Sequence, residues 1–209
     1  MNKDIREQLR LYLVIETSLL KIPLKDFIVE CFNGGVTAFQ LRDKELDANR
    51  TLENAFIIKE TISSFKEKPL FIINDRVDIA LIVGACGVHL GVKDISPKYV
   101  KQHFPNLIIG TSCNNLEDTK IANQYADYAG IGPAFYTSTK KDLRQVIGVE
   151  GISNIVKNLN IGSVAIGGIN IDNINSVLKS GVNGVALSSY ICSSDKPYDT
   201  VKALLKKYE

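Results

Sequence analysis

Polar side chains that could bind phosphate groups or a metal ion recur just after the short apolar stretches of this sequence. The densest group lies in residues 131–142, IGPAFYTSTKKD, where a Gly-Pro pair is followed by three hydroxyl residues and two lysines. A turn requires only the glycine and the proline, so the additional groups either bind an anion or form a polar surface loop. Those residues are Thr137, Ser138, Thr139, Lys140 and Lys141, of which we expect Lys141 to remain solvated.

A second polar group closes the apolar stretch at residues 36–42. In FQLRDK, Gln40, Arg42 and Lys44 alternate along the chain, and in a strand such alternation places the side chains on one face. Arginine offers a planar fork of donors and lysine a point charge, which together suit an oxygen-rich anion. The alternative is a polar strand end followed by a solvated loop.

Two aspartates follow neighbouring apolar stretches and could share a metal ion. Asn74 and Asp75 end FIIND, and Asp94 ends GVHLGVKD. Mg²⁺ prefers hard oxygen ligands and commonly takes one or two carboxylates, while water and substrate phosphates complete its coordination. The alternative is helix capping, because Asp75 precedes a helical pattern and Asp94 lies just before Ser96-Pro97.

The last two apolar stretches end in small and hydroxyl residues. AIGGIN contains Gly167-Gly168, where the backbone can approach a ligand closely, and ALSSYI contains Ser188-Ser189. In barrels of parallel strands these two loops commonly bind phosphate, although a tight turn also explains a pair of glycines. Ser112 is a further polar strand end. The two anion-binding halves indicate two phosphorylated reactants, or one reactant with phosphates at both ends.

The sequence offers no arrangement for covalent catalysis. No Cys–His or Ser–His–Asp grouping is evident, no lysine lies within an apolar stretch, and His89 and His103 are isolated. What remains is catalysis by neutralising charge and positioning the reactants. The four cysteines lack metal-site spacing, and we expect reduced, mostly buried thiols at Cys31, Cys86, Cys113 and Cys192.

Eight short apolar stretches, rich in branched residues, are expected to be buried strands. The segments between them follow helical periodicity, as in Val77, Ala80, Leu81 and Gly84. Strands that alternate with helices indicate a parallel sheet. The expected strands are residues 11–16, 36–42, 70–75, 87–91, 107–112, 128–132, 163–168 and 184–189.

This pattern predicts a single (β/α)8 barrel, or TIM barrel, that occupies residues 1–209 as one domain. Eight units without a linker fit this fold, although about 250 residues are more usual. An open doubly wound sheet is the competing fold, but no G-x-G-x-x-G motif supports it. One helix is expected to end at Gly181, because glycine adopts positive φ without strain. Active sites of such barrels lie at the carboxyl ends of the strands, where the polar groups occur.

The composition of the chain argues against nucleic acids and membranes as its partners. Its 25 Lys+Arg and 23 Asp+Glu give a net charge of +2, with no long basic run that would bind nucleic acid. The charged start MNKDIREQLR lacks the apolar core of a secretory signal, and no apolar run is long enough to span a membrane. We therefore expect a cytoplasmic protein that acts on small molecules. The oligomeric state stays open, a homodimer included.

In their order and spacing, six motifs closely resemble those of the thiamine-phosphate synthase family: GGVTAFQLRDK, INDRVDIAL, GVHLGVKD, GPAFYTSTKKD, AIGGIN and GVNGVALSS. The resemblance covers nearly the whole chain. It implies a (β/α)8 transferase that joins 4-amino-5-hydroxymethyl-2-methylpyrimidine diphosphate to 4-methyl-5-(2-phosphooxyethyl)thiazole, expected in its carboxylated form. It further implies that diphosphate departs first and that the thiazole nitrogen then captures the pyrimidine methylene cation.

The resemblance also implies a role for each matching residue. Asp75 and Asp94 would hold one Mg²⁺ per subunit. Catalysis would depend on Arg42, Lys44 and Lys140, which would stabilise charge on the departing diphosphate. The pyrimidine diphosphate would contact Gln40, Leu41, Arg42, Asp43, Lys44, Asn74, Ser112 and Lys140, and the thiazole phosphate would contact Thr137, Ser138, Thr139, Gly168, Ser188 and Ser189.

Three positions depart from the family pattern. Val92 stands where Gln is frequent in the family, Asn114 where many members have His, and Glu16 where Asp is common. The first two are candidates to alter the pyrimidine pocket, and the sequence leaves their effect open. Two alternatives remain. A thiazole tautomerase of the sister branch would rely on a histidine after the fifth strand, where this chain has Ser112-Cys113-Asn114. A non-catalytic barrel that senses thiamine precursors would lose the catalytic charges, which this sequence retains.

Overall fold

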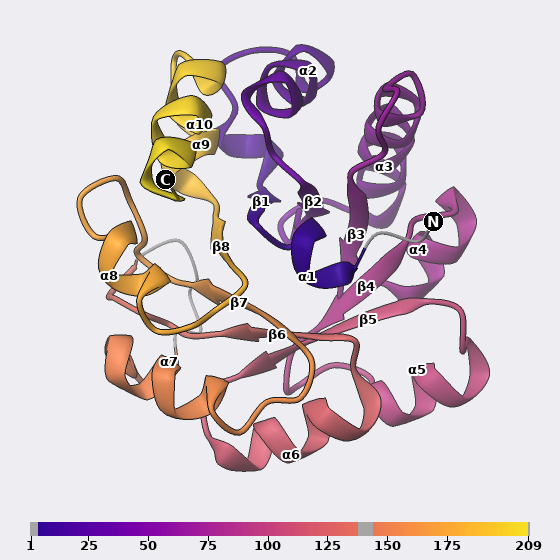
Figure 1. Cartoon of the computed structure of the whole chain (residues 1–209). Coiled ribbons are helices and arrows are strands. Elements are labelled where there is room, and N and C mark those ends of the chain that lie inside the picture. Colours follow the sequence, from indigo (N-terminus) through magenta and orange to yellow (C-terminus); the bar gives the residue numbers. More distant parts are fainter. Residues whose placement is uncertain (1–3, 138–143, 209) are drawn as a thin grey trace.

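Eight parallel strands close into a barrel with helices around its outside in the computed structural model of the chain (Figure 1). The structure describes residues 4–137 and 144–208. Neighbouring strands pair in chain order, and β1 pairs with β8 to complete the ring. The predicted (β/α)8 barrel is therefore confirmed. The strands are β1 (Leu11–Ile15), β2 (Ala38–Leu41), β3 (Leu70–Asn74), β4 (Gly87–Leu90), β5 (Ile108–Cys113), β6 (Tyr128–Ile131), β7 (Gly162–Ile166) and β8 (Gly184–Leu187).

Helices return the chain between successive strands and form the outer layer. Each strand begins and ends within two residues of its predicted bounds. Asp47 and Asn115 cap the starts of α3 and α6 by accepting hydrogen bonds from backbone N–H groups. The helices are α1 (Ile5–Gln8), α2 (Leu24–Gly34), α3 (Ala48–Ser63), α4 (Val77–Val83), α5 (Pro97–His103), α6 (Leu116–Tyr125), α7 (Gly148–Val156), α8 (Ile174–Leu178), α9 (Ser189–Cys192) and α10 (Pro197–Leu205), with 3-10 turns η1 (Thr17–Leu19) and η2 (Lys206–Tyr208).

The end of one helix differs from the sequence prediction. α8 stops at Leu178 and does not reach Gly181, which lies in the following turn with φ of 89°. The Ser180 hydroxyl donates a hydrogen bond of 2.6 Å to the Val177 carbonyl. The Ser180 and Gly181 N–H groups also donate to carbonyls three residues back, Val177 at 3.0 Å and Leu178 at 3.3 Å. Such tighter 3-10 type turns end the α-helix before Gly181.

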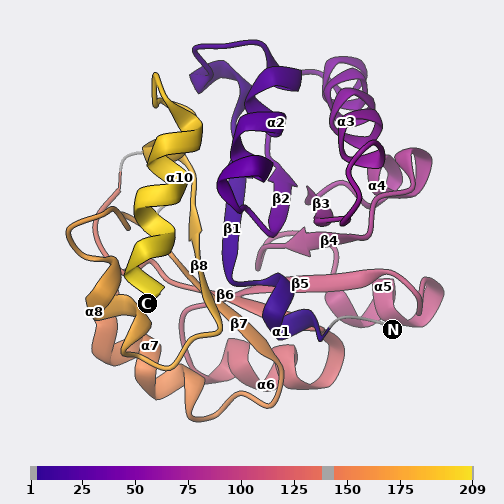
Figure 2. The same cartoon turned by 45° about the horizontal axis from the view of Figure 1, so that its top comes forward.

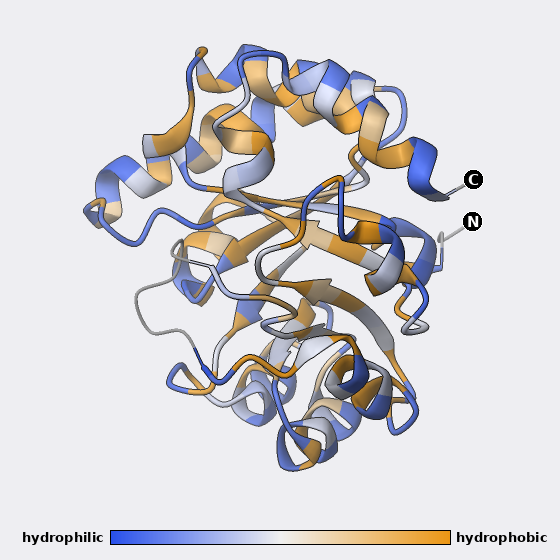
Figure 3. Cartoon of the chain, turned by 90° about the vertical axis from the view of Figure 1, so that its left-hand side faces the viewer, coloured by the Kyte–Doolittle hydropathy of each residue, from blue (hydrophilic) through white to orange (hydrophobic). Residues whose placement is uncertain are grey.

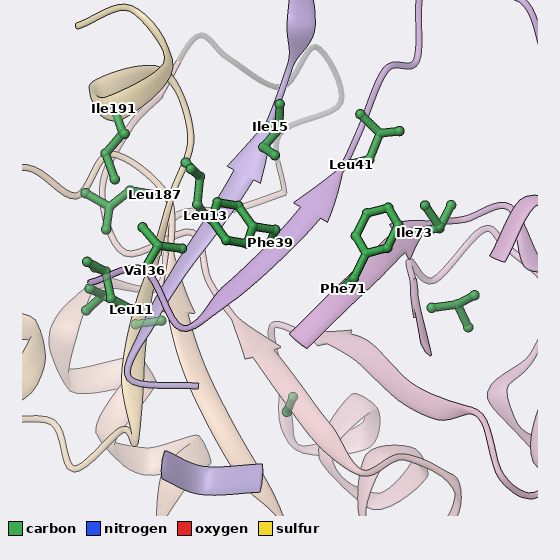
Figure 4. Packing of buried hydrophobic residues seen from close by; sticks show 14 of the residues in the cluster. Leu11, Leu13, Ile15, Val36, Phe39, Leu41, Phe71, Ile73, Leu187 and Ile191 are labelled. Atoms are coloured by element: carbon green, nitrogen blue, oxygen red, sulfur yellow. The ribbon is translucent and has the colours of Figure 1, made fainter. Parts of the chain in front are cut away.

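Side chains along each strand alternate between two apolar layers. On β1, Leu11, Leu13 and Ile15 pack against the helices, whereas Tyr12 and Val14 point into the barrel. Figure 4 shows the outer layer, in which Leu13 and Phe39 lie side by side. In Figure 3 the strands are predominantly orange, and blue polar residues lie along the surrounding helices. Because both faces of the sheet are buried, the strand sequences are almost continuously apolar.

The two chain ends complete the barrel. Ile5 of α1 and Leu9 pack against the interior cluster at the amino-terminal end of the strands, and α10 packs beside α2 (Figure 2). Tyr208 accepts a hydrogen bond from the Val185 N–H and donates one to the Arg10 carbonyl. Within the described residues, no helix has both the length and the apolarity needed to cross a membrane.

Candidate active site

A cavity opens at the carboxyl end of the barrel, lined by the inward-facing side of the strands. The two-residue period continues past the strand ends, so that Tyr12 and Val14 on β1 are followed by Glu16. Parallel strands end at the same rim, and the last inward residues therefore meet. The predicted residues that line the cavity are Gln40, Arg42, Asn74, Ser112, Thr137, Gly168, Ser188 and Ser189.

Three residues of the predicted pyrimidine-diphosphate segment, Leu41, Asp43 and Lys44, are not among the residues that line this cavity, and neither are the proposed metal ligands Asp75 and Asp94. Leu41 is 1% exposed and belongs to the layer between strands and helices. The Asp43 carboxylate accepts hydrogen bonds from the Thr17 N–H and hydroxyl, at 2.8 and 2.9 Å, and from Asn54 Nδ2 at 3.0 Å. Asp43 thereby ties the β2 loop to η1 and α3. Ser138, Thr139 and Lys140 lie outside the described residues.

Arg42 is held at the cavity wall by a carboxylate that the sequence analysis did not pair with it. Glu16 Oε1 lies 2.5 Å from Arg42 Nη1, and the two side chains are only 18% and 15% exposed. Burial raises the pKa of Glu16, although the Arg42 charge and hydrogen bond oppose this shift. Glu16, which stands where Asp is common in the family pattern, thus still supplies a carboxylate beside Arg42.

The proposed metal ligands, Asp75 and Asp94, are in contact. Their carboxyl groups share a hydrogen bond, and Lys44 Nζ lies 2.9 Å from Asp75 Oδ2. Burial and the neighbouring Asp75 raise the pKa of Asp94. Burial would also raise the pKa of Asp75, but hydrogen bonds from Asp94 and Lys44 outweigh it and lower that pKa. One proton shared by two adjacent carboxyls explains the opposite directions.

Neither aspartate serves as the helix cap that the sequence left open. The position before α4 is Arg76, and that before α5 is Ser96; neither makes a side-chain cap bond. Asp94 Oδ2 instead accepts a hydrogen bond of 2.7 Å from the Gly91 N–H. Asp75 has a φ of 60°, in the left-handed region that aspartate and asparagine enter more readily than most residues. Such backbone strain is characteristic of functional positions.

The donor set fits a magnesium ion better than a softer metal. Among residues 4–137 and 144–208, no group of three His, Cys, Asp or Glu side chains could hold a metal ion. Two carboxylates are sufficient for Mg²⁺, whose remaining ligands are commonly water and substrate phosphates. Zn²⁺ instead takes three or four protein ligands, mostly His and Cys. Asp75 and Asp94 therefore suit a hard cation that arrives with a phosphorylated substrate.

A chain of hydrogen bonds crosses the cavity floor, and sequence reasoning missed three of its members. Gln40 Nε2 donates to the Tyr12 hydroxyl at 2.8 Å, and the Tyr12 and Tyr128 hydroxyls lie 2.7 Å apart. His89 Nδ1 lies 3.2 Å from the Tyr128 hydroxyl, and His89 Nε2 lies 3.1 Å from Ser112 Oγ. The barrel interior thus holds Gln40 and Ser112 in fixed orientations.

Two glycines make room for the missed side chains and were the available signal. A Cβ on Gly110 would lie 2.2 Å from Cζ of Tyr128, and one on Gly130 would lie 2.9 Å from Cε1 of His89. Inward-facing glycines on adjacent strands therefore indicate a bulky inward neighbour. The sequence alone does not show which neighbour, because strand register fixes that pairing.

The opposite side of the cavity is a neutral cradle of backbone and hydroxyl groups. The loops after β6 and β7 lie together, since the Phe135 N–H donates to the Gly167 carbonyl at 3.0 Å. A Cβ on Gly168 would lie 2.6 Å from the Tyr136 carbonyl oxygen, so only glycine fits. Ser188 Oγ is enclosed at the start of α9 without a hydrogen-bond partner among the described residues. An enclosed hydroxyl without a partner is unusual and suits a ligand oxygen.

The other two departures from the family pattern do not line the cavity. Val92 is 58% exposed. Asn114 Nδ2 donates hydrogen bonds of 2.9 Å to the carbonyls of Gly132 and Gln145. The four cysteines are free, and Cys31, Cys113 and Cys192 among them are buried.

The fold and the cavity define a (β/α)8 barrel with anion-binding groups at the carboxyl ends of its strands. The model of the family described as thiamine monophosphate synthase matches residues 11–191. The chain is 37% identical to the thiamine-phosphate synthase of Methanococcus maripaludis and covers 98% of that protein with 97% of its own length. For the thiamine-phosphate synthase of Pyrococcus furiosus the identity is 39%, with 99% of this chain and 98% of the relative aligned.

A solved structure agrees with these relatives. The thiamine phosphate pyrophosphorylase from Pyrococcus furiosus superposes with a TM-score of 0.88 at 36% identity, over 98% of this chain and 97% of that chain. The chain belongs to the thiamine monophosphate synthase family.

Proposed function

We propose that this chain is a thiamine-phosphate synthase, a transferase that joins the pyrimidine diphosphate to the thiazole phosphate and releases pyrophosphate. The observation that carries the proposal is the pair of facing anion sites. Asp75 and Asp94 touch beside Lys44 on the β2–β4 side of the barrel, and the Gly168–Ser188 cradle lies on the β6–β8 side. Asn74, the residue before Asp75, lines the same cavity as this cradle, and we therefore assign the two phosphorylated substrates to the two sides of one cavity.

The pyrimidine diphosphate would occupy the β2–β4 side. Asp75 and Asp94 would hold one Mg²⁺, which when bound draws negative charge from the departing diphosphate. Lys44 pairs with Asp75, and Arg42 lines the cavity from the end of β2; we assign both, together with Lys140, to the diphosphate. Gln40, Asn74 and Ser112 would orient the pyrimidine ring, because the interior hydrogen-bond chain fixes two of these side chains. Leu41 and Asp43 would contribute through their backbone only.

The thiazole phosphate would occupy the opposite cradle. Its phosphate oxygens would accept hydrogen bonds from Ser188, Ser189 and Thr137, together with Ser138 and Thr139, while Gly168 lets the backbone approach. This arrangement would direct the thiazole nitrogen toward the pyrimidine methylene carbon. The carbon–oxygen bond to diphosphate breaks first, and the oxygen keeps the electron pair. The nitrogen then donates its pair to the methylene cation, in a cavity that must exclude water.

The thiazole tautomerase and the precursor sensor are less well supported. Among the described residues that line the cavity, the histidine is His89 on β4, and its ring nitrogens contact Tyr128 and Ser112. Asn114 occupies the position after β5 where the tautomerase would need a histidine. A sensor would not need the paired aspartates.

We further propose that residues 1–209 form one domain that acts in the cytoplasm.

Mixing the purified protein with both precursors and Mg²⁺ tests the function. We expect pyrophosphate and thiamine phosphate to form in equal amounts and chelation to stop both. Binding of the pyrimidine diphosphate without release of pyrophosphate would refute the synthase assignment. Isomerisation of the thiazole alone would favour the tautomerase.

A further inference from the structure

An arginine that the sequence analysis did not single out lies at the cavity wall, in the loop between β6 and α7. Arg144 lines the cavity together with Thr137 and Gly168. Its Nη1 lies 2.6 Å from Asp118 Oδ2, and the Arg144 and Asp118 side chains are 28% and 14% exposed. A guanidinium carries five donors in a planar fork, so one bond to Asp118 fixes its orientation and leaves further donors for an anion.

Asp118 and Asn114 hold the segment that carries this arginine. Besides Arg144, Asp118 Oδ2 accepts a hydrogen bond of 2.9 Å from the Asn114 N–H. Asn114 in turn bridges the carbonyls of Gly132 and Gln145 at 2.9 Å each. These bonds join α6, the end of β6 and the approach to α7. The guanidinium is therefore positioned before any ligand binds.

Arg144 lies at the β5–β6 side of the rim, where its segment contacts Asp118 and Asn114, and it lines the cavity together with Thr137 and Gly168 of the proposed thiazole site. In the ring β1 to β8, β6 and β7 lie opposite β2 and β3, and Arg144 lies between β6 and α7. Of the cavity-lining residues that the structure describes, Glu16, Arg42 and Arg144 are the acidic and basic ones, and Arg42 is paired with Glu16 on the far side. A nearby positive charge stabilises a phosphate in a neutral, partly buried cradle.

We propose that Arg144 binds the phosphate of the second substrate and that Asp118 is its positioning residue. This inference rests on the proposed function, since it concerns the phosphorylated thiazole. It explains why a largely buried ion pair lies at the cavity wall. By donating to the carbonyls of both Gly132 and Gln145, Asn114 joins the beginning and the end of the loop that carries Arg144.

The test compares thiazole phosphate with its unphosphorylated alcohol at saturating pyrimidine diphosphate and Mg²⁺. A lost charge-assisted bond should lower the preference for the phosphorylated thiazole, as a ratio of kcat/KM values, about ten- to a hundredfold in Arg144→Gln. Arg144→Lys should restore part of the preference. The KM of the pyrimidine diphosphate should stay within about twofold of the wild-type value, because we assign Arg144 to the phosphate of the other substrate.

Asp118→Asn tests the positioning role without removing the cation. We expect it to lower the same preference, and we expect Arg144→Gln/Asp118→Asn to be no worse than Arg144→Gln alone, because Asp118 acts through Arg144. Lys101→Gln is the matched control. Lys101 pairs with Asp127 at 3.0 Å, with side chains 37% and 32% exposed, and Asp127 lies at the opposite, amino-terminal end of β6. Lys101→Gln should change neither the preference for the phosphorylated thiazole nor the KM of the pyrimidine diphosphate.

The inference would be overturned by an unchanged preference in folded Arg144→Gln, by equal losses for both thiazoles, or by a loss confined to the pyrimidine diphosphate. Calorimetric binding of thiazole phosphate needs no turnover, so it tests Arg144 separately from catalysis. Should the wild-type protein release no pyrophosphate, the proposed function fails. Weaker thiazole-phosphate binding by Arg144→Gln would still support the inference, and equal binding would refute it.

Discussion

Replacing Gly168 with alanine should damage both the stability of the barrel and the phosphate cradle. Gly168 has a φ of 62°, and an added Cβ would lie 2.6 Å from the Tyr136 carbonyl oxygen and 2.8 Å from Phe135 Cβ. Carbon atoms do not approach oxygen or carbon this closely, so the loop after β6 must move. That loop also carries Thr137.

The expected loss of stability has two parts. A left-handed conformation costs a residue with a Cβ about 1–2 kcal/mol. Forcing an extra methyl group into a packed site costs about 1–3 kcal/mol more. We therefore expect Gly168→Ala to lower the free energy of unfolding by about 2–5 kcal/mol. A displacement of about 1 Å in the cradle could also reduce kcat/KM for the thiazole phosphate about a hundredfold.

Gly84→Ala separates the cost of the left-handed conformation from the cost of the steric clash. Gly84 has the same φ of 62°, but the nearest atom to its added Cβ is the flexible Lys59 Nζ at 3.8 Å. This control should lose only about 1–2 kcal/mol and keep its activity. Urea unfolding and steady-state kinetics on both variants provide the measurements. Equal losses of stability and unchanged kinetics in Gly168→Ala would refute the steric reasoning.

Three further predictions concern the charged groups. Asp75→Asn should keep a free energy of unfolding within about 1 kcal/mol of wild type, because asparagine tolerates a φ of 60°. It should nevertheless release pyrophosphate at least about a hundredfold more slowly. Wild-type turnover in this variant would show that Asp75 is not part of the site. Burial raises the pKa of Glu16 above its ordinary 4.5, so protonation favours folding. The wild-type chain should therefore lose stability relative to Glu16→Gln as the pH rises through that pKa in urea titrations, and a pH-independent difference would contradict this. Chelation of the metal should abolish pyrophosphate release and excess Mg²⁺ should restore it; turnover in EDTA would show that no metal is needed.

The sequence predicted the strands well because burial on both faces leaves a direct compositional signal. It predicted the cavity-lining Arg42, Asn74 and Ser188 because polar residues at strand ends of a barrel meet at one rim. Two kinds of residue escaped this reasoning. Tyr128 resembles any buried aromatic residue, since its inward direction depends on register.

Arg144 and Asn114 escaped for another reason. Their contacts link loops that are adjacent only after the barrel closes, and Asn114 appeared in sequence only as a departure in the pyrimidine pocket. Its two carbonyl partners, Gly132 and Gln145, lie 18 and 31 residues away. Local patterns carry no information about such distant pairs.

The most direct test of the account is the position of a divalent cation bound together with pyrophosphate. Mn²⁺ accepts oxygen ligands similar to those of Mg²⁺ and can be located by its anomalous scattering in crystals soaked with both. We predict one peak in contact with carboxylate oxygens of Asp75 and Asp94, and with pyrophosphate oxygens that also reach Arg42. Pyrophosphate bound without metal at these aspartates, or a metal peak elsewhere in the cavity, would contradict the account.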